Sequence, residues 1–565
     1  MYILGVWDGH DAGAALLEDD RILFASNEER YTKRKLEIKF PYNSIAAALS
    51  YTGIKPNDVE AVAFPTLEFT KTLSRILPYQ QEVYYRFRRR KMLKPRLEGL
   101  MHYAKYGMTS IGVLPLCATV SKAIVAKHLR SMGFANFKLY AVDHHESHAA
   151  TAAFTSGFGR SLVVTLDGLG DGLCGSISTF SKGELVRKET IPARDSLGIF
   201  YEQVTNIVGM RELEDELKVM AMACYSYPFK FEDNKLKDFF RVEGTHIKAK
   251  YTPLKQYEML GRIAWGMPRE QFAYMAQQLS EHVMTEFMRN AMEKYGIGDV
   301  TMAGGLFANV KANMQVREMD QLKRWFVFPH MGDGGIALGA AMHINYTLNG
   351  VSSYRFGNAY LGDEYSDSYI EKLLKKEKGV NFEEDASKAS HAAELLDKDN
   401  YVFWYQGRME YGPRALGNRS ILANAASETA KDRLNMYVKQ REWYQPFAPS
   451  MLDTEARGLL EYSKNADRFM TMAYRVRDGK TDGMRSVVHV DNTTRPQMVD
   501  GENRSYRAML EKVKRSTGNG VVLNTSFNIH GMPIVMSPED ALATMKKTRT
   551  RHMFLGGFYV ENKGA

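Results

Sequence analysis

One pattern at the N-terminus occurs twice, and this duplication constrains the fold more than any other feature of the sequence. The first copy reads YILGVWDG from Tyr2, followed by a loop with HDAG and a second apolar segment. The second copy reads LVVTLDG from Leu162, followed by a Gly-rich loop and CGSISTF. Each apolar strand ends in Asp-Gly, at Asp8 and at Asp167. Glycine at a strand end lets the backbone turn tightly and approach a ligand closely.

Two such halves facing each other would form a two-lobed nucleotide-binding cleft of the kind seen in actin, sugar kinases and the 70-kDa chaperones. Loop N–H groups suit a phosphate, and the carboxylate of Asp8 suits a metal-bound or ribose-bound ligand. Two ordinary β-hairpins are the alternative, which either copy alone would favour. Because the copies begin two comparable blocks, we expect a duplicated, actin- and sugar-kinase-like α/β domain over residues 1–355.

The chain has 565 residues, too many for one core, so we expect two to four domains. The formal net charge of +9 fits an anionic ligand such as a nucleotide, and would also fit RNA or a membrane surface. Three scattered cysteines imply no disulfide framework. Charged residues interrupt the first apolar run, and no stretch approaches the ~18 apolar residues of a membrane span. These features predict a cytoplasmic protein.

Strands alternate with helices up to about residue 350, and residues 269–294 carry apolar side chains at helical spacing. Charged sequence with two short helical patterns, 369–376 and 387–396, predicts a junction over residues 356–395. Strand-like YVFWYQG and GVVLNTSFN then predict a second α/β domain over residues 396–565.

A candidate metal site begins with His144 and His148, which are four residues apart at the start of an Ala-rich helix. This spacing places both imidazoles on one helix face, where they can bind one cation. Asp333, in a Gly-rich turn, is the best candidate for a third ligand. Two histidines and a carboxylate suit a catalytic iron(II) or zinc ion. The alternative is a helix N-terminus with satisfied polar side chains.

His10 follows the first Asp-Gly and is a candidate general base, because an imidazole with a pKa of about 6.5 can accept a proton at neutral pH. A turn histidine bonded to its neighbour Asp11 is the alternative.

The C-terminal part carries cations within Gly- and Pro-rich turns, notably in QGRMEYGPRALGNRS, and polar residues that end the strand VVLNTSFN. Arginine forks bind phosphate oxygens in pairs, so we expect a phosphate site there. Its candidate residues are Arg414, Arg419, Lys439, Arg441, Arg495, Asn524, Ser526 and Asn528. The basic run at residues 86–96 could bind RNA or acidic lipid, although a solvated helix face is the default interpretation.

The ordered blocks GHDAGAALLEDD, DHHESHAATAAF, AGGLFANVKAN, QGRMEYGPRALGNRSILA and LNTSFNIHGMPIV resemble those of the carbamoyltransferases of nodulation-factor and antibiotic biosynthesis. The resemblance extends from Tyr2 to about Asn562. The first domain is also similar to the tRNA threonylcarbamoyl transferase (TsaD-like) fold, and the second to its YrdC-like partner.

The resemblance implies a two-site, ATP-dependent reaction. The YrdC-like domain would make carbamoyl-adenylate from carbamoyl phosphate and ATP with Mg²⁺. The first domain would then pass the carbamoyl group to a hydroxyl, or an amine, of a small molecule or glycan. It implies an iron(II) ion, or another divalent metal, on His144, His148 and Asp333, with His10 as the base. Gly168, Gly305 and Asn309 would lie in adenylate-binding loops, and the C-terminal residues named above would hold carbamoyl phosphate and ATP.

Gly13 stands where many relatives have Ser, and Ala221 and Cys224 where Gly and Pro are more usual, so the acceptor is left open. A homodimer is possible, and nucleic acid is not the expected partner. Two other functions compete with this interpretation. One is a tRNA-modifying threonylcarbamoyl-type transferase, and the other is an actin-like ATPase scaffold without transferase activity.

Overall fold

A computed structural model describes residues 1–90, 111–462 and 464–565. The chain divides into two compact units. The first unit contains Met1–Glu28 and Leu36–Phe356, and the second contains Glu29–Lys35 and Gly357–Ala565. Within the described residues, no helix is long and apolar enough to cross a membrane.

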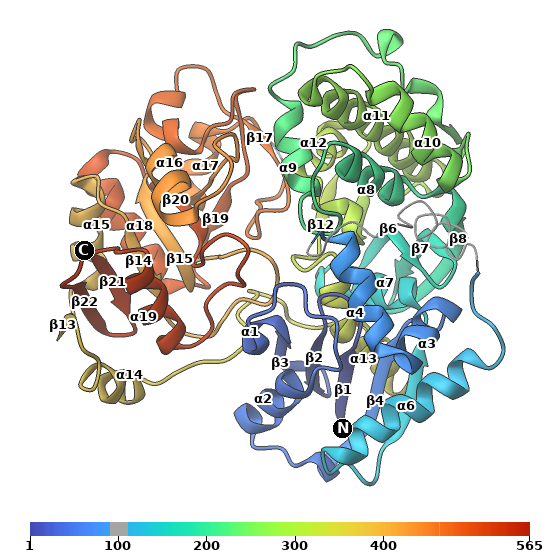
Figure 1. Ribbon diagram of the computed structural model, residues 1–565, viewed down its shortest axis with the longest axis horizontal. Helices are drawn as coiled ribbons and strands as arrows, with labels where there is room; N and C mark the ends of the chain where they lie inside the picture. The colour runs from blue at the N-terminus through green and yellow to red at the C-terminus, as the bar shows by residue number, and fades with distance from the viewer. Residues whose placement is uncertain (91–110, 463) are drawn as a thin grey trace. The chain divides into compact units, whose positions relative to one another are not determined.

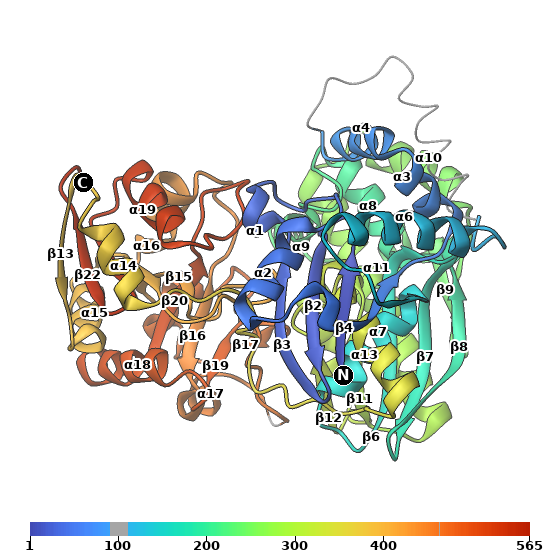
Figure 2. The same ribbon diagram turned by 90° about the horizontal axis from the view of Figure 1, so that it is seen from below.

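The first unit begins with a five-stranded sheet in the order β3-β2-β1-β4-β5 (Figures 1 and 2). Its strands are β1 (Tyr2–Trp7), β2 (Gly13–Glu18), β3 (Arg21–Asn27), β4 (Val59–Pro65) and β5 (Lys138–Val142). The hairpins β1-β2 and β2-β3 are antiparallel, whereas β4 and β5 join in parallel.

The second sheet of this unit repeats that topology in the order β12-β11-β6-β7-β8. Its strands are β6 (Arg160–Gly170), β7 (Leu173–Ser181), β8 (Glu184–Pro192), β11 (Asp299–Ala303) and β12 (Arg324–Val327). Here too an antiparallel hairpin pair is followed by two parallel strands. The predicted duplication of an α/β fold is therefore confirmed, with β1 and β6 as equivalent strands.

Two helices pack closely in the core of this unit, α7 (His144–Thr155) and α13 (Ile336–Asn349). A Cβ atom at Gly339 would lie 1.9 Å from the carbonyl oxygen of Ser147, and one at Gly5 would lie 1.9 Å from that of Ala337. Glycine therefore allows α13 to approach both α7 and β1. This close packing fixes the first turn of α7, which carries His144 and His148.

The remaining helices of this unit cover the two sheets. The predicted helix over 269–294 is α11 (Arg269–Tyr295), which buries Phe272, Leu279 and Phe287. The others are α2 (Tyr42–Thr52), α3 (Phe69–Ile76), α4 (Pro78–Arg88), α6 (Cys117–Ser131), α8 (Leu197–Ile207), α9 (Glu216–Ala223), α10 (Pro253–Ala264) and α12 (Val310–Glu318), with a β9-β10 hairpin (Phe240–Glu243, His246–Ala249).

The second unit is built on an eight-stranded mixed sheet in the order β13-β22-β21-β14-β15-β20-β16-β19. Its strands are β13 (Val380–Glu384), β14 (Val402–Tyr405), β15 (Arg419–Asn424), β16 (Ala448–Leu452), β19 (Gln497–Val499), β20 (Val521–Ser526), β21 (His552–Leu555) and β22 (Phe558–Asn562). A short β17-β18 pair (Tyr474–Arg475, Thr493–Thr494) and helices α14 (Asp367–Leu374), α15 (Lys388–Asp397), α16 (Ala430–Arg433), α17 (Asp453–Leu459), α18 (Arg504–Thr517) and α19 (Pro538–Lys547) complete it.

The stretch 356–395 was expected to be a junction, but residues 357–395 belong to the second unit. Strand β13 pairs with β22 along its whole length, and Ala392 and Leu396 of α15 lie in one apolar cluster with Trp404 and Leu510. The short helical patterns in this stretch correspond to α14 and α15.

The second unit also includes a segment from near the N-terminus, Glu29–Lys35, which contains α1 (Glu29–Thr32). The hydroxyl of Tyr31 donates to Oδ2 of Asp363 at 2.6 Å. Arg30 Nη2 donates to the carbonyl of Gly412 at 2.8 Å, so this segment supports the turn that precedes Arg414. These residues were predicted to belong to the first domain, because nothing in the local sequence indicates their distant partners.

Candidate active site

The first turn of α7 brings two imidazoles together. Asp143 caps the helix by accepting a hydrogen bond from the backbone N–H of Glu146 at 2.9 Å. The Nε2 atoms of His144 and His148 lie 3.1 Å apart, and both side chains are 1% exposed. The spacing of four residues thus places both rings on one face, as a cation site requires.

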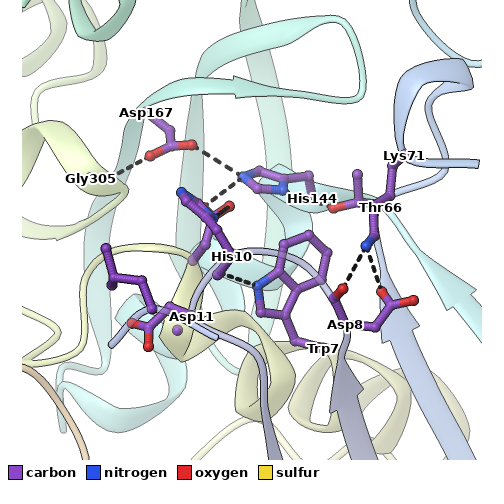
Figure 3. A network of polar contacts seen from close by, with 12 residues as sticks. Trp7, Asp8, His10, Asp11, Thr66, Lys71, His144, Asp167 and Gly305 are labelled. Atoms are coloured by element: carbon purple, nitrogen blue, oxygen red, sulfur yellow. Dashed lines mark hydrogen bonds and ion pairs between the residues drawn. The ribbon is translucent and has the colours of Figure 1, made fainter. Parts of the chain in front are cut away.

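Two carboxylates complete this group. Oδ1 of Asp333 lies 3.5 Å from Nε2 of His144 and 3.6 Å from Nε2 of His148. Oδ2 of Asp167, near the end of β6, lies 3.4 Å from Nε2 of His144, and its Oδ1 accepts from the backbone N–H of Gly305 at 2.6 Å (Figure 3). We call these four residues the histidine–aspartate cluster. Asp167 was not among the predicted metal ligands.

The cluster fits a metal ion. The four donor atoms lie within 4.8 Å of one another, and imidazole nitrogen with carboxylate oxygen is a donor set for zinc or iron(II). The Thr66 hydroxyl lies 2.9 Å from Nδ1 of His144, the outer contact that orients a metal-binding imidazole. A Cβ atom at Gly170 would overlap the His144 ring at 2.1 Å, so glycine leaves the room that this ring occupies.

The charges of the cluster favour a cation. Burial alone would lower the pKa of His144, but Asp333 and Asp167 raise it to about 10. Burial would raise the pKa of Asp333, yet His10 and His144 hold it well below its usual range. Buried carboxylates that bind protonated imidazoles this strongly can exchange those protons for a metal ion.

His10 lies beside the cluster. Its Nδ1 atom is 3.1 Å from Oδ2 of Asp333, and the Trp7 indole donates to its backbone carbonyl at 2.8 Å (Figure 3). Asp11, the partner that the alternative interpretation gave to His10, has a carboxylate oxygen 3.7 Å from Nε2 of His330. Because Asp333 holds Nδ1, the Nε2 atom is the nitrogen that can take a proton from a substrate.

Asp8, expected to bind a nucleotide, is instead paired inside the first unit. Both of its carboxylate oxygens accept from Arg75, at 2.9 and 3.0 Å, and Nζ of Lys71 lies 3.1 Å away. Burial would raise the pKa of Asp8, but Arg75 and Lys71 hold it well below its usual value. The geometry therefore assigns Asp8 to the α3 contact, in contrast to the equivalent Asp167.

The other residues predicted for the adenylate loops are Gly168 and Gly305, which lie beside Asp167, and Asn309, which caps a helix. Gly305 supports Asp167, and Gly168 adjoins it in β6. Asn309 caps α12 through the backbone N–H of Ala312 at 3.1 Å, and exchanges amide hydrogen bonds with Gln277 at 2.9 and 3.0 Å. This network gives Asn309 a role in local structure.

The second unit contains four interacting cations, Arg414, Lys439, Arg441 and Arg495, which we call the cationic cluster; Lys439 is buried and the three arginines are half-buried. Burial and the charge of Arg495 lower the pKa of Arg414 well below its usual value. The same causes lower the pKa of Arg441 to about 9. In the described part of the chain Arg414 has no ion-pair partner, and Nε of Arg495 is buried without a hydrogen bond. An arginine does not lose its proton, so an anion is the group that would relieve this charge.

Three polar residues at the end of β20 adjoin this cluster. Nζ of Lys439 donates to the Ser526 carbonyl at 2.6 Å and to Oδ1 of Asn528 at 2.6 Å. Nδ2 of Asn524 donates to the Ala415 carbonyl at 3.1 Å, which ties β20 to the turn that carries Arg414. Seven of the eight predicted phosphate-site residues therefore either belong to the cationic cluster or form hydrogen bonds with it or with a residue next to it.

Arg419 differs from the other predicted phosphate residues. Its side chain is 0% exposed and lies over the Tyr405 ring at 3.6 Å. Its Nη1 donates to the Gln406 carbonyl at 2.6 Å, and its Nε donates to the Met536 carbonyl at 3.3 Å. These contacts give Arg419 a role in the framework, while its Nη2 atom is buried with no hydrogen-bond partner in the described part of the chain.

The basic run over residues 86–96 lies partly outside the described residues, because 91–96 are not among them. Of the part that is described, Arg88 is buried, with its Nε 2.8 Å from Glu212 and its Nη2 paired with Glu202. Arg89 is buried as well and donates to the Leu36 carbonyl at 2.8 Å. The default interpretation, a solvated helix face, does not hold for these two side chains.

Comparison with known proteins places these two sites in one family. A family model described as carbamoyltransferase N-terminus matches residues 2–342, and one described as carbamoyltransferase C-terminus matches residues 393–562. The chain belongs to the carbamoyltransferase family. The predicted resemblance is therefore confirmed, and the chain is a transferase of this family. The histidine–aspartate cluster lies within the N-terminal match and the cationic cluster within the C-terminal match.

Individual relatives match this chain over between about half and nearly all of its length. The nodulation protein NolNO of Sinorhizobium fredii is 31% identical over 98% of this chain and 79% of its own. A protein of Methanocaldococcus jannaschii is 35% identical over 78% of this chain and 76% of its own. The 3'-hydroxymethylcephem-O-carbamoyltransferase of Streptomyces clavuligerus is 32% identical over 52% of this chain and 54% of its own. Among solved structures, HypF of T. kodakarensis matches at 11% identity and a TM-score of 0.35, over 62% of this chain and 48% of its own.

Proposed function

We propose that this carbamoyltransferase works in two steps, each assigned to one unit. In the second unit, carbamoyl phosphate is hydrolysed to carbamate and phosphate, and the carbamate oxygen attacks the α-phosphorus of ATP, giving carbamoyl-adenylate and pyrophosphate. In the first unit, an acceptor hydroxyl attacks the carbonyl carbon, its proton passes to His10, and AMP leaves. Adenylation gives the carbamoyl group a good leaving group.

The cationic cluster supports the first step. Two polyanions must be held together, which requires several fixed positive charges. Burial and neighbouring cations lower the pKa of Arg414, Lys439 and Arg441, which means that their protonated forms are disfavoured in the free protein and that a bound anion would stabilise them. Mg²⁺ would accompany ATP, as it does in most phosphoryl and nucleotidyl transfer.

The histidine–aspartate cluster and His10 support the second step. His144, His148, Asp333 and Asp167 would hold a divalent metal, for which iron(II) is our proposal. Such an ion would supply positive charge for adenylate oxygens. His10 is oriented by Asp333 as a base is oriented by a carboxylate in other acyl-transfer sites, with Nε2 left to accept the acceptor's proton.

The acceptor that we propose is a hydroxyl group of a small molecule or glycan. A relative is named for carbamoylation of a hydroxymethyl cephem, and others are nodulation proteins. RNA is less favoured, because Arg88 and Arg89, at the start of the basic run, are held by groups of the first unit.

The observation that carries the proposal is the division of two sites between the units of one chain: an imidazole held by Asp333 in the first, and in the second a cationic cluster with no ion pair to a carboxylate among the described residues. Its test is incubation with ATP, carbamoyl phosphate and Mg²⁺, following pyrophosphate release, with a panel of hydroxyl acceptors that includes a hydroxymethyl cephem. His10→Ala should retain pyrophosphate release and lose transfer, whereas Arg414→Ala should lose both. Loss of pyrophosphate release in His10→Ala would contradict the assignment of the steps.

A further inference from the structure

The imidazole of His10 is contacted on one face by an aromatic ring from α4. The ring centroids of His10 and Tyr85 lie 6.0 Å apart, and the ring planes differ by 29°. The guanidinium of Arg89 lies over the Tyr85 ring at 5.3 Å. Asp333 contacts Nδ1 of the His10 ring, and Trp7 donates to the backbone carbonyl of His10. Neither contact prevents the imidazole from rotating about the line that joins Nδ1 to Asp333. Tyr85 supplies that third restraint.

The direction of Nε2 depends on this ring plane. In the residues that the structure describes, Asp333 is the polar partner of the His10 ring, and the side chain is 22% exposed. A base must lie within hydrogen-bonding distance of the proton that it takes, and small errors in its position are costly for rate. Holding the plane of His10 before the acceptor arrives therefore contributes to the transfer step.

A buried ion pair anchors the helix that carries Tyr85. Arg88, one turn later on α4, pairs with Glu202 of α8 and with Glu212, at 2.8 Å for the latter. Nδ2 of Asn206 donates to the other oxygen of Glu212 at 3.0 Å. Two carboxylates on one guanidinium give a fixed geometry that a lysine would not reproduce.

Helix α8, which carries Glu202, also contacts the end of β6 where Asp167 lies. Ser196 caps the N-terminus of α8, and its hydroxyl donates to the Gly168 carbonyl at 2.6 Å. A Cβ atom at Gly198 would lie 2.8 Å from the carbonyl oxygen of Asp167, so α8 begins in direct contact with this strand end. Helix α8 thus joins the anchor of α4 to the residue that completes the histidine–aspartate cluster.

From these contacts we propose that Tyr85 is a positioning residue for His10, and that Arg88 sets the place of Tyr85 through Glu202 and Glu212. The inference rests on the proposed function of His10 as the base. It concerns acceptor transfer alone, since adenylate formation is assigned to the second unit.

The first test is independent of carbamoyl chemistry. In protein with carbon-13-labelled histidine, the ring resonance of His10, assigned with His10→Asn, carries the shielding of the stacked Tyr85 ring. Tyr85→Ala and Arg88→Ala should shift and broaden it. Tyr85→Phe should restore the wild-type position, because the ring is kept. Arg86→Ala, at an exposed position of the same helix, is the matched control and should leave the signal unchanged. A wild-type resonance in Tyr85→Ala would overturn the proposal.

The second test separates positioning from folding. With an acceptor from the panel that the wild type uses, Tyr85→Ala should lower kcat for transfer about 10- to 100-fold. Pyrophosphate release and the acceptor KM should stay close to wild type, and Tyr85→Phe should recover most of kcat. Equal loss of pyrophosphate release and transfer would indicate general damage and would overturn the positioning role. If the wild type carbamoylates nothing, the proposed function fails, while the resonance experiment still decides whether Tyr85 orders His10.

Discussion

Asp333 is shared between two chemical groups, since its Oδ2 lies 3.1 Å from Nδ1 of His10 and its Oδ1 lies 3.5 Å from Nε2 of His144. One carboxylate therefore orients the proposed base and contributes to the histidine–aspartate cluster. A metal bound in the cluster would hold Asp333, and through it His10, in one arrangement.

Asp167 should be required for metal binding. Asp167→Ala removes one of four donors and should weaken metal affinity about 10- to 100-fold, measured by competition with a chromophoric chelator. His145→Asn is the control, because His145 lies between His144 and His148 in the sequence but its Nδ1 atom lies 2.9 Å from the Thr165 hydroxyl. Equal metal content in the Asp167 variant and wild type would exclude Asp167 as a ligand.

Removal of the metal should lower thermal stability. A ligand that binds only the folded state stabilises it by about 2.7 kcal/mol at 100 times its Kd. Dialysis against a chelator should therefore lower Tm, and iron(II) or zinc should restore it. The effect should vanish in His148→Ala, which loses a donor; a Tm that does not respond to chelator in the wild type would contradict a metal site.

Arg414 and Arg419 should have opposite effects on stability, although five residues separate them. Arg419→Ala removes a fully buried side chain that packs on the Tyr405 ring and donates to the buried Gln406 carbonyl, and should destabilise the protein by on the order of 3 kcal/mol. Arg414→Ala removes a half-buried charge that has no ion-pair partner in the described part of the chain, and should be neutral or stabilising, as often happens at functional sites. Denaturant unfolding of the two variants checks this contrast, and a reversed order would contradict the framework role of Arg419.

Pyrophosphate should raise the Tm of the wild type, because it would add negative charge beside Arg414, Arg441 and Arg495, whose pKa values burial lowers. The rise should shrink in Arg414→Ala and fall with added salt. Arg485→Ala, an exposed arginine that pairs with Asp482, is the control and should keep the rise. A Tm that is indifferent to pyrophosphate would argue against an anion site there.

Glu216 should make stability depend on pH. Burial and the charge of Glu202 raise its pKa to about 8, from an ordinary value near 4.5. The folded state therefore binds the proton more tightly than the unfolded chain, and this stability is lost as the pH rises from about 4.5 through 8. Glu216→Gln cannot ionise, so its Tm should exceed that of the wild type more at pH 8 than at pH 5. Glu232→Gln, at an exposed site, should show no such trend.

The repeated strand pattern was sufficient to predict the duplicated sheets, since alternating strands and Asp-Gly ends are local features. The difference between Asp8 and Asp167 was not predictable in the same way. Arg75, which takes up both oxygens of Asp8, lies 67 residues further along the chain, and the contact depends on where α3 packs. Asp8 and Asp167 both precede a glycine at the end of a strand, but tertiary contacts place their carboxylates in different environments.

The QGRMEYGPRALGNRS segment shows the same limit. Its arginines were predicted together from their turn-rich sequence, but Arg419 begins β15 and points into the core, whereas Arg414 lies in the preceding turn. The pairing of β15 with β14 and β20 decides this direction. Sequence composition identified the region, and only the sheet register separates the side chain at the start of β15 from the one in the preceding turn.

The seven residues Glu29–Lys35 leave the first unit and complete the second, which has a consequence for biosynthesis. Their partners, such as Asp363 and Gly412, are translated more than 300 residues later. At a synthesis rate of about 5–20 residues per second, on the order of half a minute passes between synthesis of this segment and synthesis of the residues that it binds. A fragment that starts at Gly357 would lack the arginine that steadies the Gly412 turn, so the halves of this chain are not separable by one cut.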